Sequence, residues 1–308
     1  MFSKKLLIPL LSLSLLVTPA YSSHAAENTE AAGTSVESQG MLSPSSSSES
    51  SESVFNGSGA GTSSEPVTDE KLETILKQVQ SQLPAENGTW AVFISDLVNG
   101  TEGSLNDQKM QAASLIKLYI MGAVYENYDQ ITGQYGRDSV DSNLYSMITV
   151  SDNDAANTLT TYLGGGDSAA GMQAVNSFCQ AHGYDQTHMG RMLLASNEND
   201  DNYTSVGDCG HLLQEIYKQD TSGYTHATDM LNLLKAQTRC NKIPAQLPEG
   251  VKTANKTGEL DNVENDAGII YDSKNDVVIV FMSQNLSSAG SAQNTIATLS
   301  RTIYDYYN

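Results

Sequence analysis

Ser114 and Lys117 lie three positions apart at the start of an apolar segment, in the run Ser114-Leu115-Ile116-Lys117. If the segment is helical, this spacing places the hydroxyl and the amine on one face, one turn apart. A serine hydroxyl becomes an effective nucleophile when a neighbouring base takes its proton. Free backbone N–H groups at a helix start also stabilise a developing oxyanion. The pair therefore predicts nucleophilic catalysis, and the alternative is that Ser114 simply caps a helix.

Two further tripeptides carry hydroxyl, amide and amine groups. They are Ser151-Asp152-Asn153 and Lys256-Thr257-Gly258. The first stands at the head of an expected helix, where such residues are typical of an N-cap. The second ends an expected strand, where an inward Lys must be paired or functional because unpaired charges are seldom fully buried. Each tripeptide alone is weak evidence, so the order of all three motifs carries the information.

Ser-x-x-Lys, Ser-Asp-Asn and Lys-Thr-Gly are the signature set of class A β-lactamases and penicillin-binding proteins. From about residue 68 to the C-terminus the chain resembles the class A β-lactamase branch of these serine enzymes, and residues 151–157 are especially similar to it. The resemblance implies an α+β fold of the β-lactamase type. In that fold an antiparallel sheet is flanked by helices and joined to an all-helical subdomain, with the active site in the cleft between them.

The resemblance implies catalytic roles for four side chains. Ser114 would be the acylated nucleophile and Lys117 its proton acceptor. Ser151 would relay the proton to the leaving nitrogen. Lys256 would favour the neutral form of Lys117 by like-charge repulsion, and it would attract a substrate carboxylate.

Further roles follow from the same resemblance. Asn153 would hold the substrate amide, and Thr257 would bond the substrate carboxylate beside Gly258. The backbone N–H groups of Ser114 and Glu259 would donate to the oxyanion. No metal and no other cofactor is expected at this site.

The sequence also departs from the class A pattern. The Glu-x-x-Leu-Asn loop, whose Glu activates the deacylating water in that family, has no match in residues 190–204. Glu198 is the first acid there, and its polar neighbours favour a solvated loop acid over a catalytic base. The segment between Lys117 and Ser151 is shorter than usual, and Ala267 stands where many class A enzymes have a carboxylate-binding Arg. We therefore expect an acyl-enzyme that persists, and a trimmed cleft.

Hydrophobic spacing indicates the elements that must position these residues. Helices are predicted over 68–83, 115–128, 142–150, 155–163, 169–182, 206–218, 228–238 and 291–306. Strands are predicted over 90–94, 251–256, 266–271 and 277–283. This order predicts an α+β fold in which both ends of the chain build one sheet around a helical insert.

The cysteines suggest one crosslink. Cys209 lies near the start of one expected helix, and Cys240 lies just past the end of the next. An antiparallel helix pair would bring these positions together, so the sequence predicts a Cys209–Cys240 disulfide with Cys179 free and buried.

Composition bounds the domain organisation and the partners. The chain has 308 residues and a formal net charge of −20, which disfavours nucleic-acid binding because an acidic surface repels phosphate. Residues 1–25 have the pattern of a secretory signal peptide, and residues 26–66 have six Glu and no Lys or Arg, typical of a disordered linker. Residues 67–308 are expected to form the hydrolase domain. No later segment has the 18 apolar residues of a membrane span.

The histidines lack metal-ligand spacing, and the Gly-x-Ser-x-Gly, dinucleotide and P-loop patterns are absent. The leading hypothesis is therefore a secreted, monomeric serine hydrolase that acts on β-lactams or related amides. One alternative is a penicillin-binding or D-Ala-D-Ala peptidase-like enzyme acting on peptidoglycan peptides. Another is a non-catalytic protein that binds a peptidoglycan fragment.

Overall fold

The computed structural model describes residues 69–218, 226–272 and 274–308. The signal peptide and linker expected at 1–25 and 26–66 lie outside the described residues.

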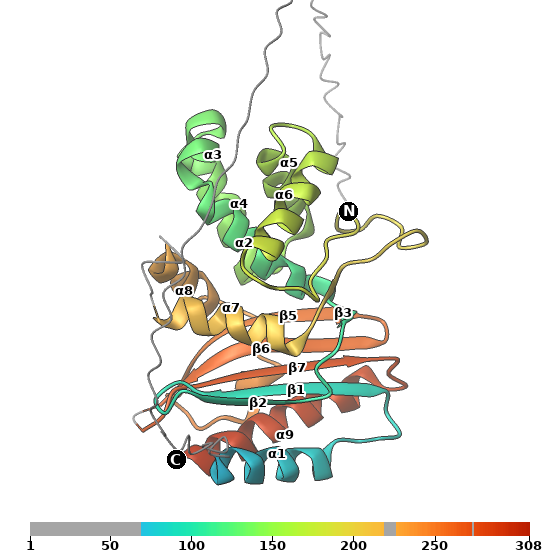
Figure 1. Ribbon diagram of the computed structural model, residues 1–308, viewed down its shortest axis with the longest axis vertical. Helices are drawn as coiled ribbons and strands as arrows, with labels where there is room; N and C mark the ends of the chain where they lie inside the picture. Colours follow the sequence, from blue (N-terminus) through green and yellow to red (C-terminus); the bar gives the residue numbers. More distant parts are fainter. Residues whose placement is uncertain (1–68, 219–225, 273) are drawn as a thin grey trace, which may run out of the picture. The chain divides into compact units, whose positions relative to one another are not determined.

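A five-stranded antiparallel sheet is the centre of the fold (Figure 1). Its strands, in the order β2-β1-β7-β6-β5, are β2 (Thr101–Leu105), β1 (Thr89–Asp96), β7 (Val277–Gln284), β6 (Val263–Tyr271) and β5 (Lys252–Leu260). Strands β1 and β2 come from the N-terminal part of the chain and β5 to β7 from the C-terminal part. The predicted α+β architecture is therefore confirmed, with β5 at an edge of the sheet.

Helices cover both faces of the sheet. Strand β1 is apolar on both sides, so each of its faces packs against a helical layer. Trp90, Val92 and Ile94 pack with α1 (Glu70–Gln82) and α9 (Ala289–Tyr307). The alternate residues Ala91 and Phe93 belong to the other core cluster, which includes residues of α7 (Val206–Lys218) and α8 (Ala227–Lys235). This period of two is the reason that one strand serves two cores.

The second part of the fold is helical. It consists of α2 (Ile116–Glu126), α3 (Tyr128–Tyr135), α4 (Arg137–Thr149), α5 (Asn153–Leu163) and α6 (Ser168–Ala181). Residues 116–125 of α2 are all buried, as the apolar sequence predicts, so α2 is the central helix of this group. A 3₁₀ turn over Ala113–Leu115 leads into it.

Several boundaries differ from the prediction. Strand β5 does not end at Lys256 but continues to Leu260, where a tight hairpin turns into β6. Strand β2 and the two-residue strands β3 (Met110–Gln111) and β4 (Tyr203–Thr204) were not predicted. Hydrophobic patterning misses them because short or half-exposed edge strands carry few apolar residues.

The predicted Cys209–Cys240 disulfide is wrong. Cys179, Cys209 and Cys240 are all free. The Cys209 side chain is buried, and its Sγ lies 3.4 Å from the hydroxyl of Tyr119. Cys240 is exposed. The two helices do pack together, but Cys209 projects into the core from the first turn of α7, whereas Cys240 lies beyond the end of α8.

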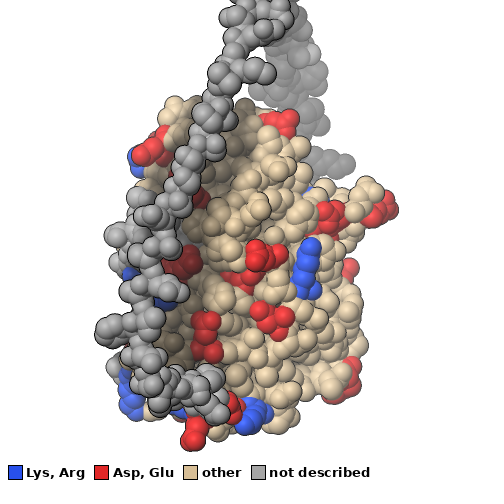
Figure 2. Space-filling model, viewed as in Figure 1, with Lys and Arg blue, Asp and Glu red and all other residues tan. Residues whose placement is uncertain are grey.

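Acidic side chains are spread across the face seen in Figure 2, in keeping with the negative net charge. Among the described residues, no helix combines the length and apolar character that crossing a membrane requires.

Candidate active site

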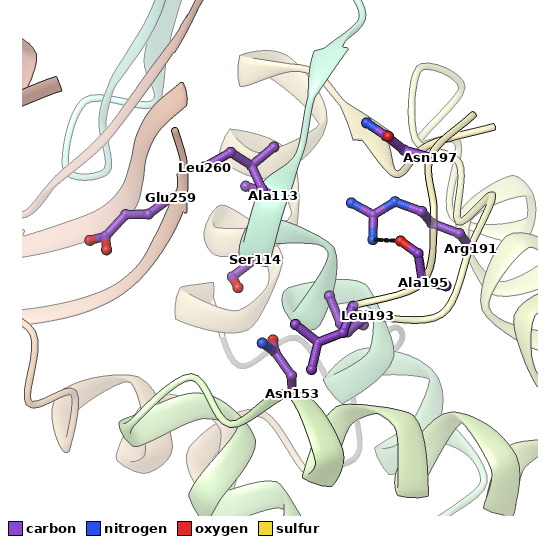
Figure 3. A pocket seen from close by; sticks show the side chains of 10 residues that line it. Ala113, Ser114, Asn153, Arg191, Leu193, Ala195, Asn197, Glu259 and Leu260 are labelled. Atoms are coloured by element: carbon purple, nitrogen blue, oxygen red, sulfur yellow. Dashed lines mark hydrogen bonds between the residues drawn. The ribbon is translucent and has the colours of Figure 1, made fainter. Parts of the chain in front are cut away.

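Two cavities that share Ser114, Asn153 and Glu259 lie where the helical part meets strand β5. The larger, about 320 Å³, is also lined by residues of the segment 191–197 (Figure 3). The smaller, about 140 Å³, is lined by Ser114, Ser151, Asn153, Arg239, Thr257 and Glu259. Side chains that are far apart in the sequence therefore converge on one hydroxyl.

Ser114 lies in the 3₁₀ turn at the entrance to α2, and Lys117 lies one turn further along. The Nζ of Lys117 is 3.1 Å from Oγ of Ser114. Lys117 is fully buried, whereas Ser114 is only half-buried and faces the cavity. The amine is thus within proton-transfer distance of a hydroxyl that a substrate can reach.

Ser151 joins the two lysines. Its Oγ lies 3.1 Å from Nζ of Lys117 and 2.9 Å from Nζ of Lys256. Lys117 also donates to the Ser151 carbonyl and to Oδ1 of Asn153, each at 2.7 Å. Lys256 donates to the carbonyl of Thr257 at 2.7 Å. Five of the predicted residues therefore form one continuous network: Ser114, Lys117, Ser151, Asn153 and Lys256.

The two amines are desolvated. Burial lowers the pKa of Lys117 to about 7, while Asp152 opposes this shift and Arg239 adds to it. Burial, together with the charge of Lys117, also lowers the pKa of Lys256 well below its usual range. From the sequence we expect a neutral, desolvated Lys117, with repulsion by Lys256 contributing to its neutral form. The structure makes burial the main cause, because the whole side chain of Lys117 lies inside the protein.

Backbone strain accompanies the network. Ala113, Ser151 and Leu194 have φ values of 47°, 61° and 67°, in the left-handed region that side chains other than glycine disfavour. Ala113 and Leu194 line the larger cavity, and Ser151 carries the hydroxyl between the lysines. Residues in this region cluster at functional sites, where the surrounding structure holds them in place.

The surroundings of Gly258 explain why the third residue of the Lys-Thr-Gly motif is a glycine. A Cβ at this position would lie 2.9 Å from the carbonyl oxygen of Ala112 and 3.2 Å from the backbone nitrogen of Ser114. Only a residue without a side chain allows β5 to pass this close to the turn that carries Ser114. The adjacent Thr257 is buried and lines the smaller cavity.

The segment from Arg191 to Asp201 forms the opposite wall and is fastened at two points. Nε of Arg191 lies 2.7 Å from Oδ1 of Asp201. The side chain of Asn157 accepts from the Leu193 N–H at 2.8 Å and donates to the Leu193 carbonyl at 3.0 Å. Asn157 lies in the segment that resembles class A enzymes, so that resemblance could have drawn attention to it. Leu193, which lines the larger cavity, had no such signal.

Acidic groups are scarce around Ser114. Glu198 is exposed and lines neither cavity, whereas Glu259 lines both. Ala267 is fully buried and pairs with Lys256 across the sheet, so no cation stands at that position. In the described ranges, no three His, Cys, Asp or Glu side chains are grouped to hold a metal ion.

The chain is similar to known proteins in both sequence and fold. The sequence profile of the Beta-lactamase enzyme family matches residues 71–138 and 134–307. Among curated proteins, none matches the chain.

Solved structures share the fold. A β-lactamase from Sphaerobacter thermophilus DSM 20745 is 22% identical with a TM-score of 0.63, and the match covers 76% of this chain and 96% of that one. PBP-A is 23% identical with a TM-score of 0.66 and the same coverages. The class A β-lactamase of the last common ancestor of Gram-negative bacteria is 20% identical with a TM-score of 0.65, covering 76% and 100%. With the family profile spanning most of the sequence and the serine–lysine network in place, the chain belongs to the beta-lactamase enzyme family of serine hydrolases.

Proposed function

We propose that this protein is an exported serine hydrolase that β-lactams or related amides acylate on Ser114, and that the acyl-enzyme breaks down slowly. One observation carries the proposal. The buried Nζ of Lys117 contacts the Oγ atoms of both Ser114 and Ser151 at 3.1 Å. A proton path therefore leads from the nucleophile toward the leaving group.

In the proposed acylation, neutral Lys117 takes the proton of Ser114 while Oγ attacks the substrate carbonyl carbon. Backbone N–H groups of Ser114 and Glu259 would stabilise the oxyanion that forms. As the carbon–nitrogen bond breaks, Ser151 gives its proton to the leaving nitrogen and is reprotonated by Lys117. Lys117 thereby returns to its neutral form, so the proton balance closes.

Substrate would be held by groups on both sides of this path. Asn153 lines both cavities and is suited to the substrate amide, while Thr257 lines the smaller cavity beside Gly258. Lys256, held 2.9 Å from Ser151 Oγ, would raise the acidity of that hydroxyl during the relay.

Slow deacylation is supported by the larger cavity. Deacylation needs a base that activates water, and Glu259 is the acidic residue that lines this cavity. Its carboxylate is already bound by Lys242 and Arg239. The segment 191–197, which forms one wall of this cavity, contributes the apolar side chain of Leu193 and no carboxylate. Water in the cavity therefore has no free carboxylate to deprotonate it.

The same observation favours a second candidate, a penicillin-binding or D-Ala-D-Ala peptidase-like enzyme acting on cell-wall peptides. A variant of PBP-A, 24% identical with a TM-score of 0.65, has been solved as an acyl-enzyme complex with penicillin G. A peptidase of this kind would use the same acylation machinery on a peptide, and a β-lactam would trap it.

Export is supported by the N-terminal sequence, in which Lys4 and Lys5 precede an apolar run and Ser23-His24-Ala25 resembles a signal-peptidase site. We propose that the mature protein acts as a monomer and that residues 26–66 tether its hydrolase domain. Sequencing the N-terminus of protein recovered from the medium tests the cleavage site.

Intact-mass spectrometry of the purified chain mixed with penicillin G tests the function. We expect an adduct of one penicillin that decays slowly, and no adduct on the Ser114→Ala variant. An adduct that survives this substitution would contradict the assignment of Ser114. Release of D-alanine from a muropeptide would favour the peptidase, whereas rapid adduct decay with penicillin hydrolysis would favour an efficient β-lactamase.

A further inference from the structure

A cluster of charged groups borders the smaller cavity. Glu259 is its centre, since Oε2 lies 3.1 Å from Nη1 of Arg239 and Oε1 lies 3.0 Å from Nζ of Lys242. Lys242 also pairs with Glu264 at 2.7 Å. Two cations thus face two carboxylates, and the cluster is neutral as a whole.

The two cations differ in access. Lys242 is fully buried, and its two carboxylate partners fix it there. Arg239 is exposed over 45% of its side chain and lines the smaller cavity together with Ser151 and Thr257. The amines of Lys117 and Lys256 are fully buried. Arg239 is therefore the cation at this cavity that an incoming anion meets first.

Arg239 is also suited to a carboxylate. Its planar guanidinium offers paired donors. One of them donates to Glu259 and another to the Val150 carbonyl at 3.4 Å. In Figure 3 the carboxylate of Glu259 is directed away from Ser114, so it does not block the nucleophile. The carboxylate of Glu259 instead forms an ion pair with the guanidinium of Arg239.

We propose that Arg239 binds the free carboxylate of the substrate and that Glu259 is a built-in competitor for it. On binding, the substrate carboxylate takes the place of Glu259 on Arg239, while Glu259 keeps its bond to Lys242. The exchange swaps one ion pair for another, so the gain from a substrate carboxylate is smaller than an unpaired Arg239 would give. Glu259 thereby sets how strongly the site prefers carboxylate-bearing substrates over neutral ones. This inference rests on the proposed function, since it names the substrate group that the same site recognises.

The test is equilibrium binding in a Ser114→Ala background, which cannot be acylated. Calorimetry compares penicillin G with its methyl ester, which lacks the negative charge. Arg239→Gln should weaken binding of the acid relative to the ester about tenfold, the loss expected for a charge-assisted hydrogen bond. Glu259→Gln keeps the backbone and the side-chain size, and it should strengthen the acid relative to the ester about threefold.

Controls separate charge from damage. Arg239→Lys keeps the charge without the planar fork and should give an intermediate preference. Arg301→Gln removes an arginine that pairs with Asp305 on the surface of α9, and it should change neither ligand. Melting temperatures identify any variant that has lost its fold.

Several results would overturn the inference. Arg239→Gln could leave the ratio of acid to ester binding unchanged. Glu259→Gln could weaken the preference for the acid, or penicillin G could fail to bind at all. Failure of the proposed function is seen separately, as the absence of an adduct on the protein that retains Ser114.

Discussion

At the scale of single residues, the proposed site contains an amine that burial makes less basic, so that it can lose its positive charge near neutral pH. Lys117 lies among oxygen atoms of Ser114, Ser151 and Asn153, with no exposed surface of its own. A solvated lysine would hold its proton at pH 7 and could not accept another. The low dielectric of its surroundings is therefore what makes Lys117 suited to the role of base.

The pH dependence of acylation tests this role. Burial lowers the pKa of Lys117 to about 7, so its reactive neutral form increases as pH rises through that value. The rate constant for adduct formation with penicillin G should increase about tenfold per unit below pH 7 and level off above it. Stopped-flow or quenched mass measurements from pH 5 to 9 would show this, and a rate that falls with rising pH would contradict it.

Leu193 provides a second test at this scale. It is nearly buried and lines the larger cavity with Ser114, so Leu193→Glu places a carboxylate beside the acyl group. The lifetime of the penicillin adduct should shorten about 100-fold, the usual contribution of a general base. Leu193→Gln, which has the size without the charge, should keep a long-lived adduct. Glu198→Gln should change nothing because Glu198 lies outside both cavities.

At the scale of elements, the proposed catalysis requires edge strand β5 to lie close to the 3₁₀ turn before α2. Strand β5 pairs with β6 on one side only, so its other side is open to the cavity. Gly258 permits the approach, and Asn157 fastens the facing segment through both backbone groups of Leu193. The two walls are thus fixed by backbone contacts, while their side chains remain free for substrate.

Gly258→Ala should disturb this approach. The new methyl group would lie 2.9 Å from a backbone oxygen, so β5 and the turn must separate by a few tenths of an ångström. Acylation of Ser114 should slow by about 10- to 100-fold, since small misplacements of reacting groups are costly. Gly290→Ala in α9, where an added Cβ meets no atom within 4 Å, is the matched control. Equal effects of the two substitutions on acylation would refute the steric explanation.

At the scale of the whole molecule, a sheet from both ends of the chain carries a helical insert, and the site forms where they meet. Ser114 comes from the 3₁₀ turn before α2, Lys117 from α2 itself, Ser151 from just before α5, and Lys256 from the sheet. The chain thus closes around its catalytic groups without a crosslink, because its cysteines are unpaired.

Thiol chemistry tests this arrangement. Burial raises the pKa of both Cys179 and Cys209 to about 12, whereas Cys240 is exposed. Ellman's reagent should therefore modify one thiol in the native protein and three after denaturation, and dithiothreitol should leave the melting temperature unchanged. Cys240→Ser should abolish the native reaction. If the denatured, unreduced protein has two titratable thiols fewer than this, it contains a disulfide, which would contradict the structure.

Much of the fold could be predicted because its signals are local. The apolar run of β1, the apolar run of α2 and the order of elements suffice for an α+β fold with a sheet from both chain ends. The end of β5 and the strands β2, β3 and β4 could not be predicted, since polar or very short strands are specified by their partners. The disulfide failed for a related reason: packing of two helices does not determine which way a side chain on one of them points.

By itself, the sequence determined which residues are proposed for the chemistry, because Ser114, Lys117, Ser151 and Lys256 lie in three motifs whose types and order are readable. Only the tertiary structure decided how those groups are charged and which others join them. Burial lowers the pKa of Lys117, Leu193 lines the larger cavity, and Arg239 and Glu259 form an ion pair beside the smaller one. Desolvation and ion pairing depend on distances between segments far apart in the chain, and these distances exist only once the chain has folded.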